Sequence, residues 1–196
     1  MRGKKLKESF NSYVLLFLCI VLGIGTGIGA AAANALDDNT KNDLFNNLYA
    51  FLNKDELASD FDLFYEGLFK YGKSITMLWI LGFTGMGLFG IFPIIFAKGA
   101  SIGFTTAFII RCMGKEGLLY ACCLYLPQNI VLIPLNIIIA FISIKFIRLN
   151  KKDKNKNEEK EFNTKDFLFC LTAAWLFIAA VSLMDVFVTP ILIGFI

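Results

Sequence analysis

Few polar side chains lie within the long apolar stretches of this chain, and those that do gather near residues 126–134, LPQNIVLIP. Gln128 and Asn129 stand there side by side, and Asp185 interrupts the last apolar stretch. The chain has no histidine, which removes histidine-based metal sites and histidine-assisted nucleophiles together. Residues 99–103, GASIG, match a nucleophile-elbow pattern, but that pattern needs a histidine base and an α/β-hydrolase sheet. We therefore expect no catalytic residue, no cofactor and no metal, and a protein that is not an enzyme.

The composition indicates a membrane protein. Of 196 residues, 57% are hydrophobic, and a helix needs about 20 apolar residues to cross a bilayer core of about 30 Å. Four stretches reach or approach that length: Tyr13 to Leu36, Ser74 to Ala97, Gly117 to Ile144 and Phe167 to Ile196. A fifth, Gly99 to Ile110, is shorter. Because lipid offers no hydrogen bonds to the backbone, these stretches must be helices. The predicted fold is all-α, a helical bundle forming a single membrane domain over residues 1–196.

The distribution of charge predicts the orientation. Four basic residues precede the first stretch, and residues 145–166 carry eight Lys and Arg against five acids. Such basic segments are typical of cytoplasmic loops, and the second one also suits anionic lipid. Residues 37–70 carry three lysines and eight acids, a net charge of −5. We therefore expect a cytoplasmic N-terminus, an extracytoplasmic segment 37–70 and a basic cytoplasmic loop 145–166.

Five spans satisfy this arrangement and place the C-terminus outside. The second would run from Ser74 to Phe92 and turn near Pro93 and Lys98, and the third would cover 94–110. Arg111, Lys115 and Glu116 would form a tight outer turn before the fourth span. The short third span could instead re-enter among its neighbours without crossing.

The first span has a competing interpretation. A basic start, an apolar run and the small residues around Ala33, Asn34 and Ala35 also describe a secretory signal with a cleavage site. The apolar run is longer than the usual core of a cleaved signal and contains several glycines, so we expect the span to be retained.

Pairs of glycines four residues apart predict close helix packing. These pairs are Gly23 and Gly27, Gly25 and Gly29, and Gly99 and Gly103. Each pair lies on one helix face and lets a neighbouring backbone approach, which matters because lipid provides no hydrophobic force between helices. The partner helix could belong to the same chain, to a second copy or to another protein.

The two prolines of the opening stretch, Pro127 and Pro134, each remove a helical hydrogen bond. We expect a kinked or interrupted helix whose freed carbonyls are met by amide side chains. A polar cavity for a solute is the alternative, because discontinuous helices line transporter sites. Asp185 would lie about 27 Å along the last span, near the outer surface, where pairing with Arg111, Lys115 or a helix N-terminus is favoured over a role in transport.

Residues 37–70 predict two short amphipathic helices. Leu44, Leu48, Phe51 and Leu52 form one apolar stripe, and Phe61, Phe64, Tyr65, Leu68 and Phe69 form the second. Such helices could lie on the outer leaflet or the bundle, or they could bind an extracytoplasmic protein.

Three stretches carry a resemblance to a known family: KGASIGFTTAF at 98–108, LPQNIVLIP at 126–134 and MDVFVTP at 184–190. Together with LWILG at 78–82 and the basic start, they make the whole chain resemble stage II sporulation protein M of endospore-forming bacteria. That family often has Glu where Asp185 stands, and its distant members carry His and Glu near Gln128 and Asn129, so roles drawn from those members do not transfer.

The resemblance implies a non-enzymatic membrane component of engulfment, in the mother-cell membrane at the sporulation septum. Such a protein recruits two septal peptidoglycan hydrolases, an amidase/endopeptidase and a lytic transglycosylase. We expect the hydrolase partner to bind the outer apolar stripes, at Leu48, Phe51, Phe61, Phe64 and Phe69. The bilayer is a further expected partner, the glycine pairs would also allow a second copy to bind, and we expect no nucleic acid. A small-solute transporter or export subunit built on Gln128, Asn129 and Asp185 is the second hypothesis.

Overall fold

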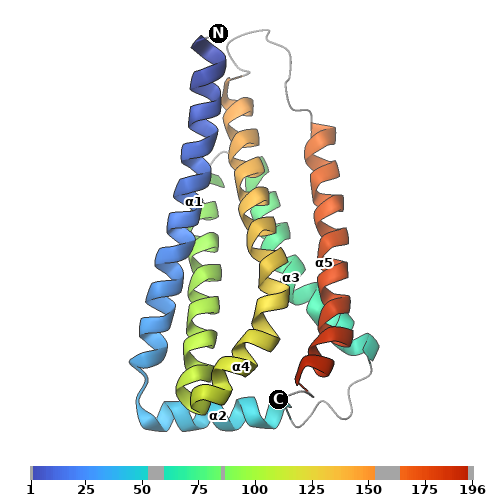
Figure 1. The fold of residues 1–196 in the computed structure, drawn as a ribbon. Helices are drawn as coiled ribbons and strands as arrows, with labels where there is room; N and C mark the ends of the chain where they lie inside the picture. The colour runs from blue at the N-terminus through green and yellow to red at the C-terminus, as the bar shows by residue number, and fades with distance from the viewer. Residues whose placement is uncertain (1, 53–59, 85–86, 153–163, 194–196) are drawn as a thin grey trace.

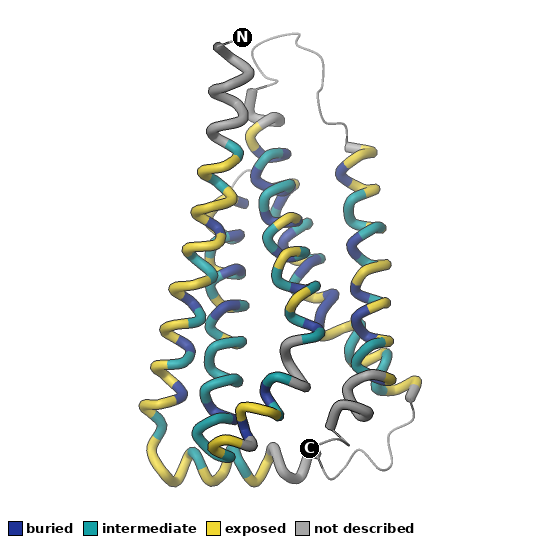
Figure 2. Tube along the Cα trace, in the orientation of Figure 1, coloured by how far each residue is buried: buried dark blue, intermediate teal, exposed yellow. Residues whose placement is uncertain are grey.

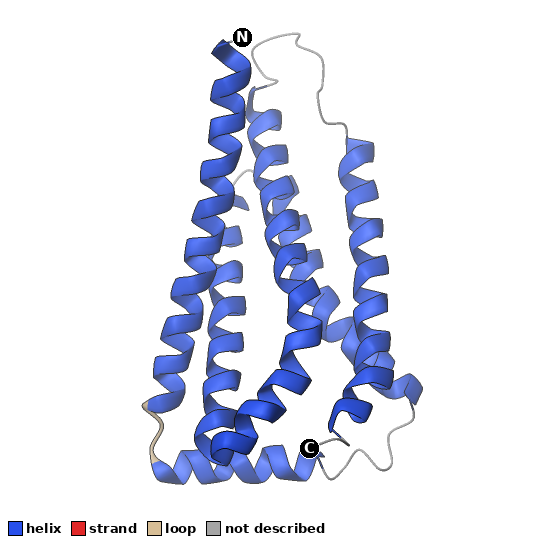
Figure 3. Ribbon diagram, in the orientation of Figure 1, coloured by secondary structure: helices blue, strands red, loops and turns tan. Residues whose placement is uncertain are grey.

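A computed structural model describes residues 2–52, 60–84, 87–152 and 164–193, and no strand occurs among them. The helices are α1 (Arg2–Asn34), α2 (Asp38–Leu52), α3 (Asp60–Phe83), α4 (Gly87–Lys152) and α5 (Thr164–Ile193). Figures 1 and 3 show long helices running side by side, with α2 lying across one end of the bundle. The predicted all-α membrane fold is confirmed.

Helix α4 is a hairpin of two helices. Gly114 has φ 60° and ψ −128°, the one non-helical conformation within α4. A side chain is strained in that region, so glycine suits the turn. Figure 1 shows the two halves, green and then yellow to orange, running in opposite directions from this point. The reversal falls within the predicted tight turn around Arg111, Lys115 and Glu116.

Four helical stretches are long and apolar enough to cross a membrane: Asn11–Asn34, Gly87–Lys115, Pro127–Arg148 and Lys165–Phe187. The predicted third span is thus long enough to cross a membrane, because α4 starts at Gly87 and continues past Pro93 to the turn at Gly114. Helix α3 runs alongside these four (Figure 1). Its first half carries acids and lysines, and only Ser74 to Phe83 is free of charge.

Two predicted boundaries are wrong. Residues Ser74 to Ala97 do not form one span, because α3 ends at Phe83 and the amide of Gly87 donates to the carbonyl of Thr84 at 3.0 Å in a turn. Pro93 and Lys98, predicted at a turn, lie inside α4. Continuous hydrophobicity from Ser74 to Ala97 gave no sign of this helix end. The predicted loop 145–166 is helical at both ends, since α4 continues to Lys152 and α5 starts at Thr164.

The two predicted outer helices are also arranged differently. The first corresponds to α2, whereas the second is the start of the longer helix α3. Residues 37–70 therefore divide between a helix lying across the end of the bundle and the first turns of a helix that enters it (Figure 1). The stripe on α3 is thus held by the same helix that packs into the core.

The core lies where α3, α5 and both halves of α4 meet, with part of α1. Its fully buried side chains include Leu18, Ile75, Leu78, Ile95, Leu132 and Ile178. Figure 2 shows buried positions recurring along the described parts of α1, α3, α4 and α5, among exposed positions, and none along the described part of α2. Many outward residues are also large and apolar, such as Leu176 and Phe177, as expected where lipid surrounds the helices.

An aromatic cluster joins α3, α5 and the end of α4. The Phe167 ring is fully buried and stacks on Phe146, with centroids 4.4 Å apart, and on Trp79 at 5.4 Å. Trp79 Nε1 donates to the carbonyl of Phe167 at 3.1 Å. This hydrogen bond and stacking fix the start of α5 against its neighbours.

Candidate functional site

Glycines hold α1 against the first half of α4. A Cβ at Gly25 or Gly29 would fall within 3.0 Å of the backbone of Phe96 or Ala100 on α4. A Cβ at Gly99 or Gly103 would meet the backbone of α1 equally closely, at Leu22 and Thr26 respectively. The structure therefore brings these four predicted glycines together in one seam where two backbones touch.

Gly23 and Gly27 are not part of that seam. Both are exposed, and no atom lies within 4 Å of the position a Cβ would take at either one. The sequence could not separate the two glycine sets, because both have the same spacing on the same helix. They differ only in which face of α1 meets α4.

Arg111 caps the end of α1. Its Nη1 donates to the carbonyls of Ala33 at 2.9 Å, Asn34 at 3.0 Å and Leu36 at 3.2 Å. These carbonyls include groups that lack helical partners at the C-terminus of α1, where a cation is also favoured by the helix dipole. Arg111, one of the three partners expected for Asp185, is thus bound at the end of α1. Asp185 has another partner.

That partner is Tyr71 of α3. The Tyr71 hydroxyl lies in hydrogen-bond contact with Oε1 of Gln128 on α4 and with Oδ2 of Asp185 on α5. Tyr71 and Gln128 are buried and Asp185 is half-buried. We call these three residues the polar junction. It joins two of the polar residues that the sequence singled out, through a tyrosine that the sequence analysis did not identify.

The polar junction has a preferred direction of donation. A tyrosine hydroxyl carries one proton, whereas a carboxylate only accepts and an amide can do either. The one proton of Tyr71 serves one of the two oxygens at a time, and an amide turned so that its NH₂ faces Tyr71 would instead let Gln128 donate to Tyr71 and Tyr71 donate to Asp185. The three helices are thus linked by one short chain of hydrogen bonds.

Two lysines flank the polar junction. Lys70 Nζ lies 5.5 Å and Lys98 Nζ 5.9 Å from the centroid of the Tyr71 ring, within the range of cation–π attraction. Lys98 comes from the first half of α4, so the polar junction and its two flanking lysines together involve α3, α5 and both halves of α4. A single lysine in an otherwise apolar stretch is a functional candidate by default, and this signal was available in the sequence.

The other residues singled out in the opening stretch are Asn129, Pro127 and Pro134. Asn129 and Pro127 are half-buried and Pro134 is exposed. The helix is continuous through both prolines, and Figure 1 shows α4 bending within its yellow stretch. Of the two predicted forms, the helix is therefore bent and not interrupted. Pro134 frees the carbonyl of Ile130, because proline has no amide proton to donate to it. The amide of Asn136 donates through Nδ2 to a different carbonyl, that of Leu132, at 2.7 Å.

An exposed row of aromatic rings runs along the start of α3. Phe61, Tyr65 and Phe69 are 72%, 54% and 60% exposed, and their successive ring centroids are 6.4 and 4.9 Å apart. Their spacing of four residues places them on one helix face. We call them the aromatic ladder. Phe64, also predicted to bind a partner, is half-buried, and the side chains of Leu48 and Phe51 lie outside the described residues.

These features define a helical membrane protein whose helices are joined by a glycine seam and a polar junction. The family model for stage II sporulation protein M matches residues 15–190. The chain therefore belongs to that family, and it is a sporulation-related membrane protein. No curated protein and no solved structure gives a significant match to it.

Proposed function

We propose that this protein is a non-enzymatic membrane scaffold of endospore engulfment. It would hold septal peptidoglycan hydrolases, an amidase/endopeptidase and a lytic transglycosylase, at the mother-cell membrane of the sporulation septum. The family supports the sporulation context, and the aromatic ladder is the observation that carries the docking role.

The docking role depends on the orientation of the chain. The proposed topology has five crossings, with α3 as the second, the N-terminus in the cytoplasm and the C-terminus outside. It is supported by the basic residues near the start of α1 and the end of α4, which lie at one end of the bundle, and by the acidic segment 37–70 at the other (Figure 1). Labelling of single cysteines placed at Lys115 and at Thr40 only from outside would support this topology, and labelling of either only from the cytoplasm would contradict it.

The chemistry of the ladder favours a protein partner over lipid. Aromatic rings at a membrane surface often anchor a helix in the headgroup layer. Here the exposed acids Asp62 and Glu66 each follow a ring of the ladder by one residue on α3, and residues 37–70 carry a net charge of −5. An anionic membrane surface repels such a segment. Three exposed rings on a rigid helix are the type of anchor that dominates protein interfaces.

The test replaces the ladder and follows the hydrolases. In sporulating cells, the triple variant F61S/Y65S/F69S is expected to insert normally but to lose septal recruitment of a fluorescently tagged hydrolase. The matched control is F89S/F169S, because Phe89 and Phe169 are 81% and 73% exposed and lie near the starts of α4 and α5, at the opposite end of the bundle (Figure 1). Unchanged recruitment by a ladder variant present in the membrane at normal amount would refute the docking role.

A transport function would give different results. The meeting of Gln128 and Asp185 at Tyr71 is the observation that favours it. In that case Q128L and D185N would abolish solute flux in proteoliposomes, while the ladder variant would leave flux intact. The scaffold proposal predicts no flux from the purified protein, and also no cleavage of peptidoglycan without an added hydrolase.

A further inference from the structure

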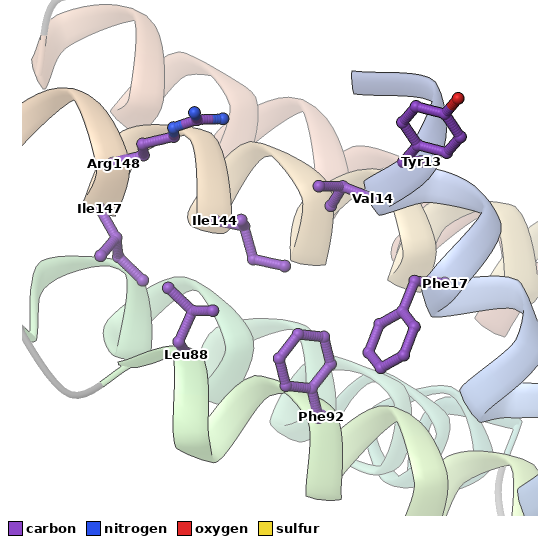
Figure 4. A pocket seen from close by; sticks show the side chains of 8 residues that line it. All are labelled: Tyr13, Val14, Phe17, Leu88, Phe92, Ile144, Ile147 and Arg148. Atoms are coloured by element: carbon purple, nitrogen blue, oxygen red, sulfur yellow. The ribbon is translucent and has the colours of Figure 1, made fainter. Parts of the chain in front are cut away.

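A cavity of about 610 Å³ lies between α1 and the two halves of α4. Tyr13, Val14 and Phe17 line it from α1, Leu88 and Phe92 from the first half of α4, and Ile144, Ile147 and Arg148 from the second half. Figure 4 shows the apolar side chains facing the hollow from three ribbons. Its volume falls in the range of about 300–1,000 Å³ found for small-molecule sites. We call it the lateral groove.

The surroundings of the lateral groove determine what can fill it. Ile144 and Ile147 are buried, whereas Tyr13, Phe17 and Leu88 are exposed along the side. All of its lining residues belong to the apolar stretches that are long enough to cross a membrane. The medium beside the groove is therefore lipid. An empty apolar groove would lose the packing contacts of its lining, so a hydrocarbon chain is the natural occupant.

Charge identifies the kind of lipid. Arg148 is the one charged residue lining the lateral groove, and its side chain is exposed at the last residue of the apolar stretch Pro127–Arg148. Lys145, Lys151 and Lys152 lie within one turn or so of it on α4, and the start of α1 adds four more basic residues. A guanidinium binds phosphate through two parallel hydrogen bonds. Basic pockets between membrane helices of this kind bind anionic headgroups.

We propose that the lateral groove binds one acyl chain of an anionic phospholipid, with the headgroup phosphate held by Arg148. The bound chain fills the space between α1 and the α4 hairpin at the basic end, while the glycine seam closes the same pair of helices further along. The site lies at the opposite end of the bundle from the aromatic ladder, so it does not depend on hydrolase recruitment.

The experiment counts bound lipids by native mass spectrometry. Full-length protein is purified from nanodiscs of phosphatidylglycerol or of phosphatidylcholine with the same acyl chains. The expected result is one retained phosphatidylglycerol per protein and at least a tenfold lower occupancy by phosphatidylcholine. R148Q should lose this preference and R148K should keep part of it, because lysine retains the charge without the bidentate geometry. K165Q is the matched control, since Lys165 is an exposed cation at the start of α5 that does not line the groove.

A second variant tests the cavity independently of charge. V14F adds a ring at the wall of the lateral groove and leaves Arg148 in place, so it should displace the retained lipid without lowering thermal stability in detergent. Equal retention of both lipids by the wild type would overturn the proposal, as would equal losses in R148Q and K165Q, which would indicate diffuse attraction. A second copy of the chain filling the groove would also overturn it, and would appear as a dimer in the same spectra that V14F dissociates.

Discussion

The glycine seam between α1 and α4 allows a controlled test of what holds this bundle together. Gly29 and Gly27 are two residues apart on α1, and both lie in its apolar stretch. Replacement of either by alanine gains the same intrinsic helix propensity, about 1 kcal/mol in soluble helices. Their surroundings differ. A Cβ at Gly29 would meet the carbonyl group and Cα of Ala100 closer than 3.0 Å, whereas a Cβ at Gly27 meets nothing within 4 Å.

The expected difference follows from that contact. The group that a Cβ meets at Gly29 is backbone, which cannot rotate away as a side chain does, so the two helices must separate. Overpacking of this kind costs about 1–3 kcal/mol. Since the propensity gain is common to both variants, it cancels, and Gly29→Ala should be less stable than Gly27→Ala by about that amount. The Gly27→Ala variant should be as stable as the wild type or more stable.

The assay is reversible unfolding of the purified protein in one detergent, with Gly25→Ala and Gly23→Ala as a second matched pair. Gly25 should behave like Gly29, because its Cβ would meet the carbonyl oxygen of Phe96, and Gly23 should behave like Gly27. If all four variants had the same stability, close backbone contact would not be what holds α1 to α4.

Three further predictions concern single residues. Tyr71→Phe removes the hydroxyl that joins Gln128 and Asp185 and should lower the free energy of unfolding by about 1–3 kcal/mol, because it leaves buried groups unpaired. The control is Tyr65→Phe, which changes an exposed tyrosine on the same helix. Equal stability of the two variants would contradict the role of the polar junction. Phe167→Ala should cost about 3–5 kcal/mol in the same unfolding assay, because that ring is fully buried, whereas Phe169→Ala, in a largely exposed position, should cost far less. The hydrogen bonds from Thr40 at the start of α2 lower the pKa of the Asp37 carboxyl from its usual value. The charged carboxylate therefore stabilises the folded helix at neutral pH. This contribution disappears as the pH falls through the lowered pKa. Amide exchange at Thr40 should accelerate there in the wild type, and Asp37→Asn, which keeps a capping side chain but does not titrate, should show no such step.

The sequence by itself determined the class of this protein and the ends of several elements. Apolar length requires membrane helices, and the fourth and fifth predicted spans overlap the apolar helical stretches Pro127–Arg148 and Lys165–Phe187. The reversal at Gly114 was predictable for a local reason, because charged residues and glycines interrupt two apolar stretches there. The membership in the stage II sporulation protein M family was also evident from contiguous residues, and the family match confirms it.

Only the tertiary structure decided which faces of these helices meet. In a soluble protein, the buried face of a helix is marked by apolar residues that recur every three or four positions among polar ones. In lipid both faces of a helix are apolar, so this mark is absent. Helix α5 illustrates this, since Phe177 is exposed and Ile178 beside it is fully buried. For the same reason the spacing of Gly23, Gly25, Gly27 and Gly29 could not indicate which two contact α4.

The partners of the polar residues were undetermined for a related reason. The spacing of residues along one helix does not reveal which residue of another helix lies opposite. The sequence therefore left Asp185 with three expected partners, Arg111, Lys115 or a helix N-terminus, whereas folding places Arg111 at the end of α1 and Asp185 against Tyr71. Sequence thus specified that the chain forms long apolar helices, while the rotation of each helix about its axis, set by packing between backbones, specified what their residues contact.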